Sequence, residues 1–192
     1  MSIQPYMEQE GLSYFKETLS HSSCYLEFGC GGSTVYACNE TKIENVISID
    51  TDAEWIQKVR EETRGALKLH LDYVNLGEVG EWGIPKSTSQ YGDFWKYSTA
   101  PWKKANELNV VPDTVLIDGR FRVACFLYSL LSARVGTTII FDDYFNRPHY
   151  FVSEKYYSVE LRAGRIAVFK VSKQFNINDL VADYAKYAID WS

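Results

Sequence analysis

The stretch "YLEFGCGGST" (residues 25–34) joins an apolar, strand-like run to a cluster of three glycines. The run carries an acidic residue, Glu27, directly before the glycine-rich turn. Such a turn lets a ligand lie against bare backbone, because glycine has no side chain and accepts backbone conformations that other residues avoid. Dinucleotides, nucleoside triphosphates and S-adenosylmethionine all bind glycine loops after a first strand. The rest of the chain has to distinguish between these three ligands.

Composition predicts a globular protein with a single domain, 1–192. A chain of 192 residues suits one domain with a sizeable core, and 46% hydrophobic and 23% charged residues are ordinary values. The net charge of −5 and the absence of a Lys/Arg cluster disfavour a nucleic-acid partner. No apolar run approaches the roughly 20 residues of a membrane span, and the first residues do not resemble a signal peptide. We therefore expect a cytoplasmic protein, with its four cysteines reduced and buried.

Apolar runs alternate with helical patterns from residue 24 onward. The expected strands are 24–28, 45–50, 66–71, 113–118 and 137–143, followed by two strands within 157–171 and a C-terminal helix. Repeated strand–helix units form right-handed crossovers and therefore a parallel sheet covered on both faces. The final pair of strands adds an antiparallel hairpin strand at one edge. The fold class is α/β, with a Rossmann-like, mostly parallel sheet and helices on both faces.

The segment 72–112 interrupts this alternation, because it shows no clear periodicity over about forty positions. It is rich in aromatic residues, which argues against disorder. We interpret it as an ordered flap over the carboxyl edge of the sheet, with Trp82 and Trp95 contacting the substrate. The alternative is a packed surface excursion that only covers an exposed part of the sheet.

The glycine turn and the next strand end narrow the choice of ligand. In open α/β sheets ligands bind beyond the carboxyl ends of the strands, and Asp50 ends the second strand where an acid can accept both ribose hydroxyls. No Gly-Lys-Ser/Thr follows the turn, so a phosphate-binding Walker loop is absent. In the dinucleotide pattern G-x-G-x-x-G, counted from Gly29, the third glycine is replaced by Thr34. This favours S-adenosylmethionine over NAD.

"LEFGCGGST" followed by "VISID" resembles motifs I and II of class I S-adenosylmethionine-dependent methyltransferases. The resemblance implies that Glu27, Gly29 and Gly31 contact the methionine part of the cofactor, that Asp50 binds its ribose, and that Asp72 lies near adenine. The complete set of cofactor-binding residues that we predict is Glu27, Gly29, Cys30, Gly31, Ser33, Asp50, Asp72 and Asp118.

Three aspartates follow the fourth and fifth strands: Asp118, Asp142 and Asp143. Three like charges at one edge are costly without a cation, and oxygen-only ligands favour Mg²⁺. The arrangement is similar to the cation-dependent O-methyltransferases of the catechol and macrocin types, in which such aspartates hold a metal. This resemblance implies that the three aspartates bind Mg²⁺ and that Tyr144, in "DDY", contacts the substrate. The alternative is that the aspartates only cap the following helices or turns.

The match to those enzymes lacks their general base. The positions that carry a lysine or a carboxylate in the family hold Arg120 and Phe121 here, and arginine does not accept a proton at neutral pH. His149 is the best remaining base, and we assign catalytic roles to His149, Asp118 and Arg120. In "DGRFR", Arg120 and Arg122 are also candidates for binding a carboxylate or phosphate of the substrate.

The leading hypothesis is a methyltransferase that uses S-adenosylmethionine, assisted by Mg²⁺, to methylate an oxygen of a small molecule. The second hypothesis is a catalytically degenerate, methyltransferase-like binding or regulatory protein, which the missing base favours. An NAD-dependent oxidoreductase is the weakest of the three, because it needs the third glycine. The expected partner is a small-molecule acceptor, without nucleic acid or membrane, and a homodimer stays open.

Overall fold

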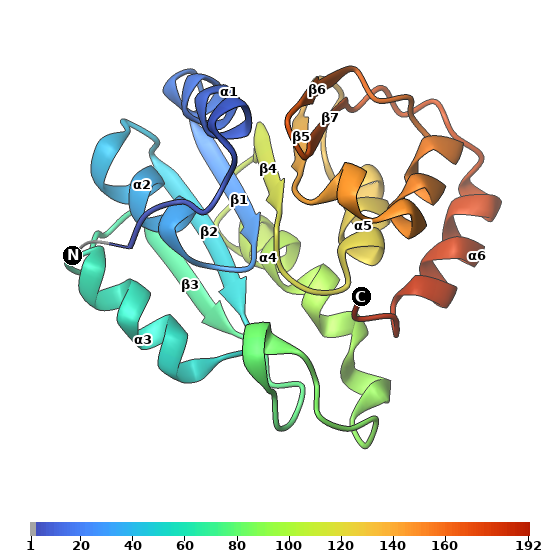
Figure 1. Cartoon of the computed structure of the whole chain (residues 1–192), viewed down its shortest axis with the longest axis horizontal. Coiled ribbons are helices and arrows are strands. Elements are labelled where there is room, and N and C mark those ends of the chain that lie inside the picture. The colour runs from blue at the N-terminus through green and yellow to red at the C-terminus, as the bar shows by residue number, and fades with distance from the viewer. Residues whose placement is uncertain (1–2) are drawn as a thin grey trace.

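The computed structural model describes residues 3–192 and consists of one seven-stranded sheet with helices on both faces (Figure 1). The strand order is β3-β2-β1-β4-β5-β7-β6. The five parallel strands are β1 (Cys24–Phe28), β2 (Asn45–Asp50), β3 (Leu69–Tyr73), β4 (Thr114–Ile117) and β5 (Thr138–Phe141). The C-terminal hairpin consists of β6 (Leu161–Ala163) and β7 (Ile166–Lys170), and β7 pairs antiparallel with β5. The predicted α/β class and antiparallel hairpin are confirmed.

The helices form two layers. The bounds of the helices are α1 (Gln9–Ser20), α2 (Gly32–Glu40), α3 (Ala53–Glu62), α4 (Trp95–Glu107), α5 (Arg122–Ser132) and α6 (Ile177–Tyr187). Contacts join α2 and α3 to β2 and β3 on one face, whereas α4 packs on β1, β2 and α5 on the other, and α5 packs on α6. Every residue of β1, β4 and β5 is buried, as expected for central strands covered on both faces. Within residues 3–192, no helix is long and apolar enough to cross a membrane.

The strand register aligns the carboxyl ends of β1, β2, β4 and β5. Phe28 of β1 pairs with Ile49 of β2 and with Ile117 of β4, which in turn pairs with Phe141 of β5. The residues that follow these four therefore meet at the same edge of the sheet. They are Gly29, Asp50, Asp118 and Asp142. This edge is the one where ligands bind in folds of this kind.

Two sequence expectations need correction. The third strand begins at Leu69 rather than at residue 66, because Leu67 lies almost fully exposed in the turn after α3. The segment 72–112 is not without periodicity, since α4 occupies its second half. Pro101 and the β-branched Thr99 lower helix propensity there, but burial of Trp102 against the sheet and α5 outweighs them. All four cysteines are free and buried, as predicted.

Candidate functional site

Asp50 connects the end of β2 with the glycine turn. Its Oδ2 accepts the backbone N–H of Cys30 at 3.1 Å, and its Oδ1 accepts the backbone N–H groups of Thr51 at 2.7 Å and Asp52 at 3.0 Å. Burial raises the pKa of Asp50 to about 6, against these N–H donors, which favour the charged form. The carboxylate is thus fixed at the strand end before any ligand arrives.

Glu27 lies beneath the turn and is fully buried. Its carboxylate accepts four hydroxyl groups, from Tyr25 at 3.0 Å, Ser48 at 2.9 Å, Ser33 and Thr34. Burial raises its pKa to about 7, although all four hydroxyls favour the charged form.

Glu27 is predicted to contact the methionine part of the cofactor, and in this structure its buried carboxylate accepts hydrogen bonds from four hydroxyl groups. Ser33, also predicted to bind the cofactor, is buried and donates to Glu27 instead. The role that this geometry gives both residues is to hold the turn from below. Thr34 adds a second link, because its hydroxyl also accepts the N–H of Gly31 at 2.9 Å.

The turns after β1 and β4 touch backbone to backbone. Gly29 has φ of +92°, and a Cβ there would lie 2.7 Å from the Cα of Gly119. A Cβ on Gly119 would in turn lie 1.9 Å from the hydroxyl oxygen of Tyr97. Only glycine fits either position. The edge between β1 and β4 is therefore lined by backbone, which is the kind of surface that a cofactor with an adenosine and an amino-acid part uses.

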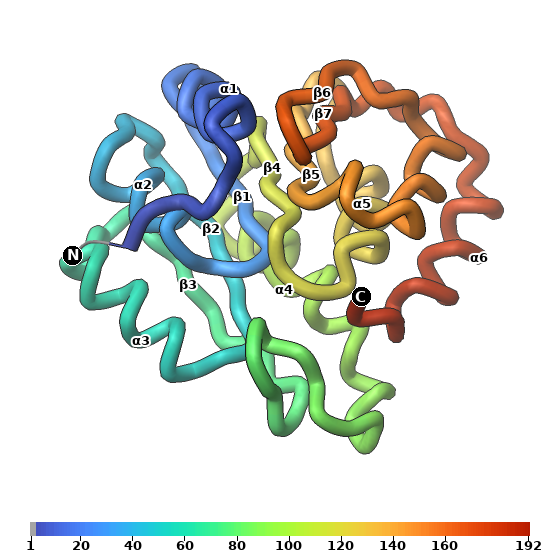
Figure 2. Tube along the Cα trace, in the orientation of Figure 1, coloured from blue at the N-terminus to red at the C-terminus, as the bar shows by residue number. Residues whose placement is uncertain are grey.

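The N-terminal segment lies over the glycine turn, where it is the dark blue stretch of the tube in Figure 2. A Cβ on Gly32 would lie 2.0 Å from the carbonyl carbon of Gln4, so the two backbones are in contact. Two residues further on, the carbonyl oxygen of Tyr6 accepts a hydrogen bond of 2.6 Å from Arg165. Nothing in the sequence pattern indicated this contact, because it joins segments 159 residues apart.

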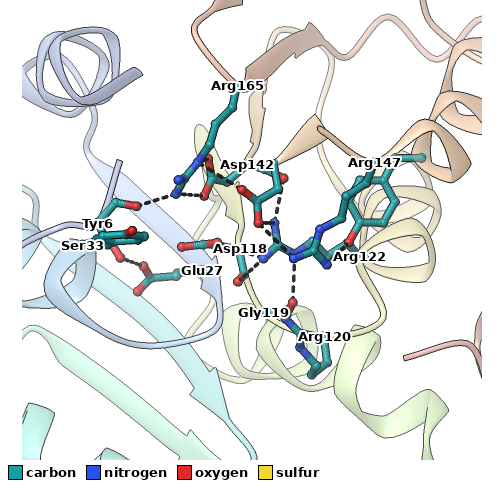
Figure 3. A network of polar contacts seen from close by, with 12 residues as sticks. Tyr6, Glu27, Ser33, Asp118, Gly119, Arg120, Arg122, Asp142, Arg147 and Arg165 are labelled. Carbon is teal, nitrogen blue, oxygen red and sulfur yellow. Dashed lines mark hydrogen bonds and ion pairs between the residues drawn. The ribbon is translucent and has the colours of Figure 1, made fainter. Parts of the chain in front are cut away.

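At the ends of β4 and β5, arginines pair with all three aspartates (Figure 3). Asp142 is fully buried and accepts both Nε and Nη2 of Arg165, at 2.9 and 2.8 Å. Asp118 pairs with Arg122 at 3.1 Å. The three partners of Asp143 are Arg122 at 3.4 Å, Arg147 at 3.2 Å and Arg165 at 3.1 Å.

The predicted magnesium site is not supported. Three guanidinium groups already balance the charges of the aspartates and occupy their oxygens, and bidentate arginine contacts of this kind are strong. Across residues 3–192, no group of three or more His, Cys, Asp or Glu side chains is arranged to hold a metal ion. The sequence placed the carboxylates correctly at one edge but did not show which cations meet them.

Two residues predicted to contact the substrate are buried in this structure. Arg122 is only 3% exposed, and its guanidinium donates to the carbonyl oxygens of Gly119, Asp118 and Asp142. Tyr144 is fully buried among phenylalanine rings and donates to Glu154. Neither side chain has a group free to contact a substrate.

Asp118 keeps an unusual protonation equilibrium despite its ion pair. Removal from bulk water raises its pKa well above the ordinary value, the positive charge of Arg122 opposes this, and the carboxylates of Asp142 and Asp143 raise it again. A side chain that is 30% exposed thus holds a proton more tightly than a free aspartate does.

The remaining predicted residues lie around this edge. His149 is exposed, with its ring 4.3 Å from that of Tyr150. Asp72 lies inside β3, not after it, and pairs with Lys104 of α4 at 3.3 Å. Trp95 begins α4 and is partly exposed under Lys103.

Trp82 is 80% exposed and lies next to Gly83 at the tip of a hairpin closed by the pairing of Val79 with Pro85. A Cβ on Gly83 would lie 2.6 Å from the hydroxyl oxygen of Thr51 and 3.9 Å from Oδ1 of Asp50. The hairpin therefore covers the end of β2, beside the acid expected to bind ribose.

Comparisons with solved structures agree with this geometry. A methyltransferase-like protein of Silicibacter pomeroyi DSS-3 superposes with a TM-score of 0.89 and 26% identity over 98% of each chain. The O-methyltransferase of Bacillus cereus in complex with S-adenosylhomocysteine has a TM-score of 0.58 and 13% identity, over 88% of this chain and 83% of its own. An RNA methyltransferase of Salinibacter ruber, also with S-adenosylhomocysteine, has a TM-score of 0.51 and 11% identity, over 90% of this chain and 97% of its own. No family model and no curated protein sequence matches the chain. The chain therefore has the fold of class I S-adenosylmethionine-dependent methyltransferases.

Proposed function

We propose that this protein transfers a methyl group from S-adenosylmethionine to an oxygen of a small molecule, without a divalent cation. The observation that carries the proposal is the fixed carboxylate of Asp50 against the Cys30 N–H, beside the bare backbone of Gly29. An acid at this strand end can bind the ribose of the cofactor, and a glycine turn can bind its amino-acid group. The likeness to the methyltransferase-like protein of Silicibacter pomeroyi supports the same assignment.

Bound S-adenosylmethionine would supply an electrophilic methyl group, so that the acceptor gains a C–O bond while the S–CH₃ bond breaks. The residues of this chain must then accept the hydroxyl proton. Asp118 suits this role at the end of β4, because a carboxylate with a raised pKa is a better base near neutral pH. His149 is the second candidate, exposed in the 3-10 helix Pro148–Lys155 that comes after β5.

The arginines support a mechanism that does not need Mg²⁺. In the cation-dependent enzymes that the sequence resembles, a metal balances the carboxylates, whereas Arg165 and Arg122 balance them here. We expect turnover to continue in EDTA at an unchanged rate. A requirement for added Mg²⁺ would contradict this part of the proposal.

Calorimetric titration with S-adenosylhomocysteine, with NAD⁺ as the control ligand, tests the cofactor. We expect micromolar binding of S-adenosylhomocysteine alone. Binding of NAD⁺ alone would revive the oxidoreductase hypothesis, and binding of neither would reject the assignment.

A binding or regulatory protein is the second candidate function. The observation that favours it is that Phe121, at a position where the related enzymes carry their base, is fully buried. This hypothesis predicts cofactor binding without production of S-adenosylhomocysteine in a screen of hydroxylated acceptors. Production above that of an Asp118→Asn, His149→Gln variant would reject it.

A further inference from the structure

Three arginines pair with the three aspartates at the ends of β4 and β5, whereas a fourth arginine, Arg120, lies in the turn after β4. Arg122, Arg147 and Arg165 contact the carboxylates at 2.8 to 3.4 Å. For Arg120, no acidic side chain of residues 3–192 lies within ion-pair distance, and Figure 3 shows it apart from the carboxylates. The charge of Arg120 therefore has no ion-pair partner among residues 3–192.

The surroundings of Arg120 make this charge costly. Its Nε is shielded from solvent and has no hydrogen-bond partner in the part of the chain that the structure describes. Burial lowers the pKa of Arg120, and the positive charge of Arg122 lowers it further. A buried N–H donor that loses water without gaining an acceptor destabilises the protein unless a ligand supplies that acceptor.

Arg120 lies between the flap and the loop after β5. Its Cγ is 4.0 Å from the position of a Cβ on Gly83, and its backbone N–H donates to the hydroxyl of Tyr97 at 3.3 Å. On the other side, Arg147 donates to the hydroxyl of Tyr150 at 3.1 Å and is partly exposed. Arg120 directly follows Gly119, whose backbone contacts Gly29, so it lies beside the glycine turn and next to the hairpin 79–85.

We propose that Arg120 binds an oxyanion, a carboxylate or a phosphate, that belongs to the methyl acceptor. A guanidinium group presents its N–H donors as a planar fork that matches two oxygens of such a group. The charge of Arg147 adds to the attraction at short range. The assignment of the oxyanion to the acceptor rests on the proposed function, whereas the anion site itself rests on Arg120 alone.

Binding of simple oxyanions tests the proposal. The probes are inorganic phosphate, para-hydroxybenzoate and its neutral amide, para-hydroxybenzamide, titrated by NMR with and without S-adenosylhomocysteine. The variants are Arg120→Gln, Arg120→Lys and the control Arg134→Gln, which removes the same charge from an exposed arginine after α5. Thermal melts identify any variant that fails to fold, and in that case the Arg120→Lys titration decides.

We expect the wild type to bind at least one oxyanion in the millimolar range and the neutral amide at least about tenfold more weakly. Arg120→Gln should weaken oxyanion binding about tenfold, Arg120→Lys less, and Arg134→Gln hardly at all. Preference for phosphate or for benzoate identifies the source of the oxyanion.

Equal binding by wild type and Arg120→Gln, or no oxyanion binding at millimolar concentrations, would overturn the proposal. These outcomes are independent of the cofactor. Oxyanion binding without S-adenosylhomocysteine binding leaves the anion site intact and rejects the proposed function. Binding of S-adenosylhomocysteine without binding of an oxyanion rejects only the anion site.

Discussion

Two groups of acids occupy the same edge of this sheet, and the protein stabilises them differently. The glycine corner, made of the turn 29–32 with Glu27 and Asp50, uses hydroxyls and backbone N–H groups. The arginine corner, made of the aspartates after β4 and β5, uses guanidinium groups. Neutral donors compensate burial only in part, so the pKa of Glu27 rises to about 7 and that of Asp50 to about 6. In the arginine corner burial also raises the pKa of Asp118, although the charge of Arg122 opposes the shift. Charged partners bind more strongly, but the loss of one leaves a buried charge.

The largest effect is expected in the arginine corner. Arg165→Met leaves the fully buried carboxylate of Asp142 without its bidentate partner, and should lower the free energy of unfolding by about 4 kcal/mol. Urea unfolding measures it. The double variant Asp142→Asn, Arg165→Met should recover much of the loss, because no unpaired charge remains.

Arg134→Met is the matched control, since that arginine is exposed. A change of less than about 1 kcal/mol for both Arg165→Met and the control would mean that the buried pair contributes no more than a surface pair. The two corners would then not differ in the way proposed.

The second prediction concerns ligand binding at the glycine corner. Asp50→Ala should weaken binding of S-adenosylhomocysteine about 100-fold, because it removes the proposed acceptor for two ribose hydroxyls and a link to the Cys30 N–H. Asp72→Ala removes an acid that pairs with Lys104 and should have an effect below about threefold. Calorimetric titration with S-adenosylhomocysteine compares the dissociation constants of the two variants. Equal losses would show that Asp72 contacts the adenine, as the sequence implied.

The glycine corner was largely predictable because its parts follow one another along the chain. The strand 24–28, the glycines after it and Asp50 at the next strand end have spacings that fix their positions once the sheet is parallel. The spacing did not show that the Glu27 side chain lies beneath the turn, inside the protein. Its four hydroxyl partners include Ser48, from a different strand.

The arginine corner was only half predictable. The strand ends gave the three aspartates, but Arg165 comes from the hairpin and reaches Asp142 across 23 residues. Repulsion among the carboxylates must be offset by a positive charge. The sequence alone does not tell whether a metal ion or an arginine supplies that charge. Helix α4 was missed for a related reason, because burial of Trp102 stabilises it against its local propensity.

The third prediction uses the protonation of Glu27. Its pKa is about 7 in the folded protein and 4.5 ordinarily, so the folded state binds more protons between these values. The free energy of unfolding should therefore be highest below about pH 4.5 and fall by about 3 kcal/mol as the pH rises through 7.

Glu27→Gln, which cannot ionise, should remove the part of this decline that Glu27 contributes and leave the part due to Asp50, whose pKa is also raised. Glu54→Gln on the exposed start of α3 is the control. Urea unfolding between about pH 5 and pH 8 measures the difference. Parallel pH profiles for wild type and Glu27→Gln would show that the hydroxyls keep the carboxylate charged throughout.

The smallest effect should show whether the flap belongs to the glycine corner. Trp82 has φ of +59°, which costs a bulky residue about 1 kcal/mol, so Trp82→Gly should unfold no more easily than the wild type. A strained, exposed tryptophan beside Gly83 and Asp50 has a reason to persist if it packs on the bound cofactor. We therefore expect Trp82→Gly to weaken S-adenosylhomocysteine binding about fivefold, as for one lost aromatic contact. Trp95→Ala, at the start of α4, should leave it unchanged. If Trp95→Ala gave the larger loss, the cofactor pocket would extend along α4, and the hairpin 79–85 would cover the end of β2 without contacting the cofactor.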